Sequence, residues 1–135
     1  MSFTSPSQNI SYQIDCRIAT DGLTVILDNN AADPGSNYPP IDCGQNTRLA
    51  AIQTSADIIA SVFSFSGGIS SGDSSTVTVA PMHTMDGTDV SMIVDASGDF
   101  VIANPQWFYS ARFLLIKSNI ALTVGAKLKL IVRPI

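Results

Sequence analysis

The chain of 135 residues contains no glutamate, since all eleven acidic residues are aspartate, and it has only three lysines. Glutamate and lysine are among the residues that helices favour. The sequence instead carries 27 serine and threonine residues and 24 isoleucine and valine residues, which favour turns and strands. This composition argues against an all-α fold, and the length fits one domain.

Charged residues are also few, at 13% of the chain, and they sum to a net charge of −4. A nucleic-acid-binding surface needs clustered lysine and arginine, so this balance argues against nucleic acid as a partner. No run of about eighteen apolar residues occurs, which argues against a membrane span. Residues 1–9 lack the basic and apolar regions of a signal peptide, so we expect the protein to fold in the cytoplasm where it is made.

Side chains that commonly carry catalysis are scarce. His83 is the one histidine, and it follows a proline at the end of a predicted strand. A catalytic triad or a cysteine–histidine site would have to use it, so we expect a surface histidine and no enzyme activity. Cys16 and Cys43 are too few for a disulfide framework, and we expect reduced, buried thiols. No cofactor is predicted.

Four aspartates lie close together in the sequence, namely Asp86, Asp89, Asp95 and Asp99. Carboxylates suit a hard cation such as calcium, but the spacing of an EF-hand loop is absent. Aspartate and glycine next to each other, as in residues 86–87 and 98–99, are typical of turns. We therefore interpret these residues as turns between strands and predict no metal site.

Alternation of apolar and polar residues predicts strands along most of the chain. The pattern is strict at residues 126–133, where Leu128, Leu130 and Val132 share one face. The predicted strands cover residues 12–18, 23–27, 48–54, 59–65, 75–80, 90–94, 99–102, 112–118 and 126–133. Turn residues separate them, and no helix is predicted. This spacing is typical of an all-β, two-sheet antiparallel sandwich, and we expect one of jelly-roll type.

The first part of the chain differs from the rest. Residues 1–11 are polar and are expected to form an extended N-terminal arm. Residues 29–46 are dense in turn residues, and their adjacent prolines exclude a central strand. We therefore expect an arm and lead-in hairpin over residues 1–28 and a sandwich body over residues 29–135, within a single domain. Long irregular segments tend to carry contacts.

Aromatic and apolar residues in the irregular segments and at the start of the first strand are the candidate interface residues. They are Phe3, Ile10, Tyr12, Tyr38, Pro39, Pro40, Trp107 and Tyr109. Residues 107–109 are three consecutive aromatics, and in an extended segment at least one of them would be exposed. An exposed aromatic suits stacking on a sugar ring or anchoring an interface. The alternative is that the three residues plug one end of the sandwich.

The C-terminal part of the chain carries a resemblance to a known family. Residues 98–105 read Gly-Asp-Phe-Val-Ile-Ala-Asn-Pro, and residues 111–118 read Ala-Arg-Phe-Leu-Leu-Ile-Lys-Ser after the aromatic Phe108. Residues 128–134 then alternate apolar residues and end in Arg-Pro. This pattern, over roughly residues 41–135, resembles the small β-sandwich structural proteins of tailed bacteriophages.

The resemblance implies a virion protein that binds the outer surface of the capsid as a cement or decoration protein. It implies the major capsid protein as partner, a location on the capsid surface after synthesis in the bacterial cytoplasm, and a homo-oligomer, with a trimer favoured. Residues 1–28 are expected to dock on the shell or exchange strands between protomers, unless they form only the first strands of the sandwich. Two alternative functions stay open: a carbohydrate-binding module of the same fold, and a neck or tail component.

Overall fold

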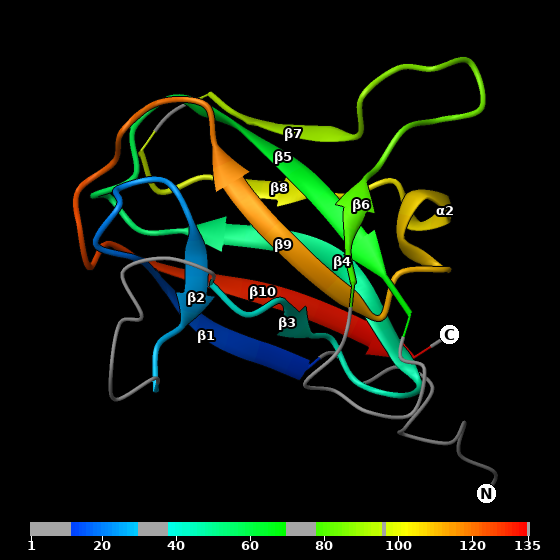
Figure 1. Cartoon of the computed structure of the whole chain (residues 1–135). Coiled ribbons are helices and arrows are strands. Elements are labelled where there is room, and N and C mark those ends of the chain that lie inside the picture. Colours follow the sequence, from blue (N-terminus) through cyan, green and yellow to red (C-terminus); the bar gives the residue numbers. More distant parts are fainter. Residues whose placement is uncertain (1–11, 30–37, 70–77, 96, 135) are drawn as a thin grey trace, which may run out of the picture.

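A computed structural model describes residues 12–29, 38–69, 78–95 and 97–134 (Figure 1). Phe3, Ile10 and the rest of the predicted arm lie outside these residues. The elements are β1 (Tyr12–Ile18), β2 (Val25–Leu27), β3 (Ile41–Asp42), β4 (Thr47–Thr54), β5 (Ser61–Gly68), β6 (Ala80–Pro81), β7 (Ser91–Val94), β8 (Phe100–Ile102), α2 (Pro105–Phe108), β9 (Phe113–Ser118) and β10 (Lys127–Pro134).

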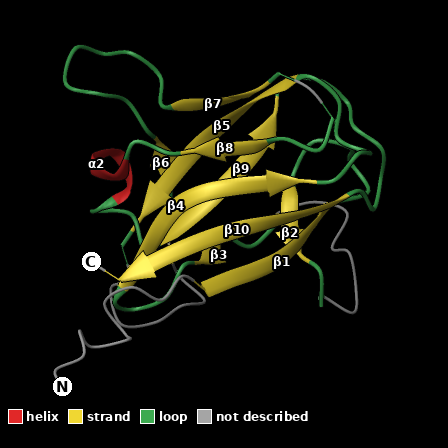
Figure 2. Ribbon diagram, turned by 180° about the vertical axis from the view of Figure 1, so that it is seen from behind, coloured by secondary structure: helices red, strands yellow, loops and turns green. Residues whose placement is uncertain are grey.

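The strands form two antiparallel sheets that pack face to face (Figure 2). The first sheet has the order β2-β1-β10-β4-β8, and in the second the order is β3-β9-β5, with β6 and β7 both paired to the remaining edge of β5. Without β2 and β6, the order is β1-β10-β4-β8 against β3-β9-β5-β7, which is the jelly-roll arrangement. The predicted all-β sandwich of jelly-roll type is therefore confirmed.

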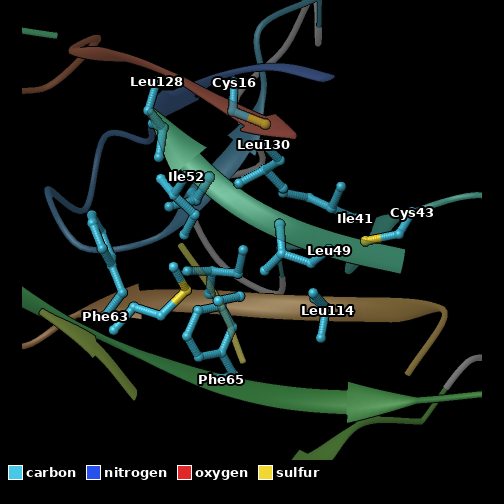
Figure 3. Close-up of a cluster of buried hydrophobic side chains, with 14 of the residues drawn as sticks. Cys16, Ile41, Cys43, Leu49, Ile52, Phe63, Phe65, Leu114, Leu128 and Leu130 are labelled. Atoms are coloured by element: carbon cyan, nitrogen blue, oxygen red, sulfur yellow. The ribbon is translucent and has the colours of Figure 1, made fainter. Parts of the chain in front are cut away.

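The core lies between the sheets, and β10 is central to it. Leu130 is fully buried and pairs in register with Ile14 of β1 on one side and Ile52 of β4 on the other. Figure 3 shows Leu130 and Ile52 on the side facing Phe63 of the second sheet. Burying a side chain of this size stabilises the fold by about 1.5–3 kcal/mol. The alternation predicted for residues 126–133 therefore identifies the core face of this strand correctly.

The turn between β1 and β2 is built from local hydrogen bonds. The Asp21 carboxylate accepts from the backbone N–H groups of Leu23 and Thr24, each at 2.8 Å. Gly22 has a φ of 73°, which glycine adopts without strain. Because β1 also pairs with β10 over residues 12–17, the described part of the predicted arm and lead-in hairpin forms the first two strands of the first sheet.

Two elements were not predicted from the sequence. In addition, residues 75–77 of the strand predicted at 75–80 lie outside the described residues, and of residues 78–80 only Ala80 belongs to a strand, β6. Residues 105–108 form the short helix α2, where an extended segment was expected, so the prediction of no helix was wrong. The Asn104 side chain accepts from the Gln106 N–H at 3.2 Å, and Pro105 occupies the start of the helix with its φ already suitable. The second difference is β3, a two-residue edge strand that follows Pro40 and pairs with β9.

Candidate interaction surface

The predicted interface residues near the start of the chain lie far apart. Tyr12 is 48% exposed at the start of β1, opposite Val132. The Tyr38 hydroxyl lies 3.4 Å from that of Thr20, beyond the other end of the same strand. A strand of this length spans roughly 20 Å, so Tyr12 and Tyr38 do not share a site. Of the two prolines after Tyr38, Pro39 is exposed and Pro40 is half-buried.

The three consecutive aromatics divide between core and surface. Phe108 is fully buried and meets Phe65 edge to face, with ring centroids 5.0 Å apart. Trp107 is partly buried and packs against the core. Tyr109, which follows the last residue of α2, is 54% exposed. Two of the three thus help to close this end of the sandwich, and Tyr109 is the aromatic that is available for contacts.

Tyr109 lies on a half-open groove of about 340 Å³ at the α2 end of the molecule. We call it the arginine groove. Its accessible walls come from four places in the fold: the start of β4, the end of β8, the residue after α2 and the end of β10. These walls are formed by Arg48, Ala50, Ile102, Tyr109, Arg133 and Pro134. Ile102 is 78% exposed, so the groove combines two guanidinium groups with exposed apolar surface.

The two arginines are brought together by the pairing of β4 with β10. Opposite Ile131 and Val132, β4 contains one extra residue, which forms a bulge. Because of this bulge, Arg133 pairs with Arg48 and not with Leu49. The Arg48 guanidinium donates to the carbonyl of Tyr109 at 2.9 Å and to that of Thr47 at 2.7 Å. Carbonyls hold this side chain in place without cancelling its charge. Among the described residues, neither Arg48 nor Arg133 forms an ion pair with a carboxylate.

A further arginine lies at the same end of the sheets but is already paired. Arg112 donates to both carboxylate oxygens of Asp42, at 2.8 and 2.9 Å, and its guanidinium lies 5.0 Å from the centre of the Phe113 ring. The hydrogen bonds from Arg112 hold the pKa of Asp42 below its ordinary value. This bidentate pair joins β3 to the start of β9, since Asp42 and Phe113 are in register.

The second feature of the surface is the hairpin of residues 82–90, between β6 and β7. The Val90 N–H donates to the Met82 carbonyl at 3.0 Å, and the Thr84 N–H donates to that of Thr88 at 2.8 Å. The chain reverses where the Gly87 N–H donates to the Thr84 carbonyl at 2.9 Å, with Gly87 at a φ of 86°. This is a tight turn with a glycine bulge, a common way to end a hairpin.

The tip of the 82–90 hairpin presents two carboxylates and one apolar side chain. Asp86 accepts hydrogen bonds from the Thr84 hydroxyl and from the Thr88 N–H, and these bonds lower the pKa of Asp86 to about 2. Met85, beside it, is fully exposed. Figure 1 shows the hairpin extending beyond β6 and β7 on the side of the molecule that carries α2.

His83 lies on the same hairpin and pairs with its other carboxylate. The His83 Nε2 atom is 3.0 Å from Asp89 Oδ1, and the histidine side chain is 49% exposed. The prediction of a surface histidine is therefore correct. The turns predicted at residues 86–87 and 98–99 are also present, with Gly98 at a φ of 70°. No group of three or more metal-binding side chains occurs in the described part of the chain.

The two cysteines are free thiols buried in the core, as predicted. Burial is the main cause that raises the pKa of Cys16 and of Cys43 to about 12. A thiol with so high a pKa is protonated at neutral pH and is a poor nucleophile. Over the described ranges, the structure contains no helix long and apolar enough to cross a membrane.

Comparison of the chain with family models, with curated proteins and with solved structures found no match. The resemblance carried by residues 41–135 therefore stays a prediction. Of these surface residues, Tyr109 was predicted as an interface candidate, whereas Arg48, Arg133 and Met85 were not. For Arg133 a signal was present, because the alternation in residues 126–133 places it opposite the core face. Arg48 and Arg133 meet only through the bulged pairing of two strands, which no local pattern reveals.

Proposed function

We propose that this protein is a structural virion protein of a tailed phage, which binds the outer surface of the capsid as a cement or decoration protein. The observation that carries the proposal is where the residues of the predicted resemblance lie. Residues 41–135 include all the described strands from β3 to β10, which contribute to both sheets of the jelly roll. The predicted resemblance is therefore spread over both sheets and is not limited to one local motif.

The surface gives further support to a role in binding other proteins. Arginine and tyrosine are enriched at protein interfaces and among the residues that contribute most to binding. The arginine groove combines both with the exposed side chain of Ile102. We propose the major capsid protein as the partner, a trimer as the assembly, and residues 1–11 with the part of segment 29–46 that precedes β3 as the parts that contact the shell. Tyr12 lies where the first of these segments joins β1.

Shell stability tests this proposal. Purified full-length protein is added to shells of the phage that encodes it, prepared without the protein, and their disruption is followed by calorimetry. We expect the protein to sediment with the shells and to raise their disruption temperature. A variant that lacks residues 1–11 should bind the shells less while keeping its own melting temperature. Shells that neither bind the protein nor gain stability would contradict the proposal.

A carbohydrate-binding module is the second candidate, and the position of Tyr109 favours it. Its ring is exposed beside Arg48 on a half-open groove, an arrangement that suits stacking on a sugar. Trp107, the other candidate for stacking, packs against the core, but its fluorescence can report on the neighbouring Tyr109. Glycan binding predicts a fluorescence change when host polysaccharide is added, which Tyr109→Ala abolishes. Capsid binding predicts no response to polysaccharide.

A further inference from the structure

We propose that copies of this protein associate head to tail, with the 82–90 hairpin of one protomer seated in the arginine groove of the next. The inference rests on the proposed function in one respect: it supplies the contact surfaces of the homo-oligomer proposed there. It can be tested on the purified protein without any shell, so the two proposals can fail separately.

Charge complementarity is the first argument. The groove presents Arg48 and Arg133, and the structure gives neither a carboxylate partner among the described residues. The hairpin presents Asp86 and Asp89, and Asp86 stays ionised far below neutral pH because its pKa is about 2. Guanidinium groups bind carboxylates with charge-assisted hydrogen bonds, often through two donors at once. Asp89 also lies 3.0 Å from His83 of the same hairpin, and its side chain is 82% exposed.

The apolar parts of the two surfaces also match. Met85 is fully exposed at the tip of the hairpin, so its apolar side chain is available to a partner. The groove has apolar walls from Ile102, Tyr109 and Pro134 and a volume of about 340 Å³. The groove thus has room for the methionine side chain and a carboxylate together. Methionine is flexible and adapts to irregular apolar surfaces.

Both surfaces are held in shape before they meet. Backbone hydrogen bonds between Thr84 and Thr88, and the bonds that Asp86 accepts, fix the turn at the hairpin tip. Backbone carbonyls hold the Arg48 guanidinium beside Tyr109. Ordering flexible segments is a main cost of association. Because little ordering is needed here, a contact of this modest size can hold protomers together.

The contact has a consequence for symmetry. The hairpin and the groove are different patches of the same chain, so their contact is heterologous. Such a contact builds a closed ring when the rotation between neighbours divides the circle, and an open filament when it does not. A ring of three protomers would give the trimer of the proposed function, with each hairpin and each groove occupied.

The test is the oligomeric state of the purified full-length protein, measured by sedimentation velocity over a range of concentrations. We expect an oligomer that dissociates as salt is added, because screening weakens the ion pairs. Met85→Ser and Arg133→Asp should each weaken association at least tenfold. The double variant Asp89→Arg with Arg133→Asp should regain association, because the charges are exchanged across the contact.

Two matched variants control for general effects. Ile93→Ser removes an exposed apolar side chain from β7, and Lys129→Asp reverses a charge on the same face of β10, outside the groove. Both should associate like the original protein, and all variants should keep its melting temperature. A protein that is monomeric at every concentration would overturn the inference. The inference would also be overturned if Met85→Ser and Arg133→Asp left association unchanged. The same holds if the double variant associated no more tightly than Arg133→Asp alone.

Discussion

Replacing Phe108 by alanine removes the side chain that closes the α2 end of the core. Phe108 is fully buried, and its ring meets that of Phe65 edge to face at 5.0 Å. Truncating a buried phenylalanine costs about 3–5 kcal/mol, because the apolar contacts are lost and a cavity is left. Since an aromatic pair adds about 0.5–1.5 kcal/mol beyond burial, we expect a value in the upper part of that range. Small proteins are stable by only about 5–15 kcal/mol, so this loss is large.

The assay is urea unfolding followed by circular dichroism, which gives the free energy of unfolding for each variant. Tyr109→Ala is the matched control, because it removes the adjacent aromatic side chain from a site that is 54% exposed. We expect Tyr109→Ala to change the free energy of unfolding by no more than about 0.5 kcal/mol. If Phe108→Ala costs no more than Tyr109→Ala, α2 does not contribute to the core and our account of this end of the sandwich is refuted.

Three further predictions concern the helix cap, one ion pair and the thiols. Asn104→Ala should lower the free energy of unfolding by about 1 kcal/mol and Asn104→Asp should retain it, because both Asn and Asp cap α2; equal losses on urea unfolding would contradict the cap. Hydrogen bonds from Arg112 hold the folded-state pKa of Asp42 below its unfolded value of about 3.9. The ion pair therefore contributes its full stability above that unfolded pKa. This contribution is lost as the pH falls through the folded-state pKa. The pair is partly exposed, so Asp42→Asn should cost at most about 1 kcal/mol at pH 7 and less near pH 2; a cost that melting curves show to be independent of pH would refute this. Cys16 and Cys43 should resist alkylation at pH 8 in the native protein and react once it is unfolded; rapid labelling of the folded protein, seen by mass spectrometry, would show that they are not buried.

The strands with strict alternation were predictable, because a half-buried strand must alternate apolar and polar residues. β1 begins and ends at the predicted residues, and residues 126–133 differ from β10 by one residue at each end. The short helix was missed because its aromatic residues favour strands, while its actual signals are the cap by Asn104 and the proline that follows. β3 was missed because two residues after a proline pair carry no detectable period.

The candidate site was less predictable than the fold. The alternation in β10 is a signal for Arg133 on the outer face, although Arg133 was not among the predicted interface residues. One of the three aromatics is exposed, as expected, and it is Tyr109. The groove itself depends on the register between β4 and β10 and on a bulge in that ladder. A sequence pattern defines which face a residue occupies, but not which residue of another strand lies beside it.

The copy number of the protein in virions tests the proposed function most directly. Virions of the phage that encodes the chain are purified, and quantitative mass spectrometry gives the ratio of this protein to the major capsid protein. A decoration protein is predicted to reach an abundance comparable to that of the shell protein. A few copies per particle would indicate a neck or tail component instead. Absence of the protein from purified virions would contradict a structural role altogether.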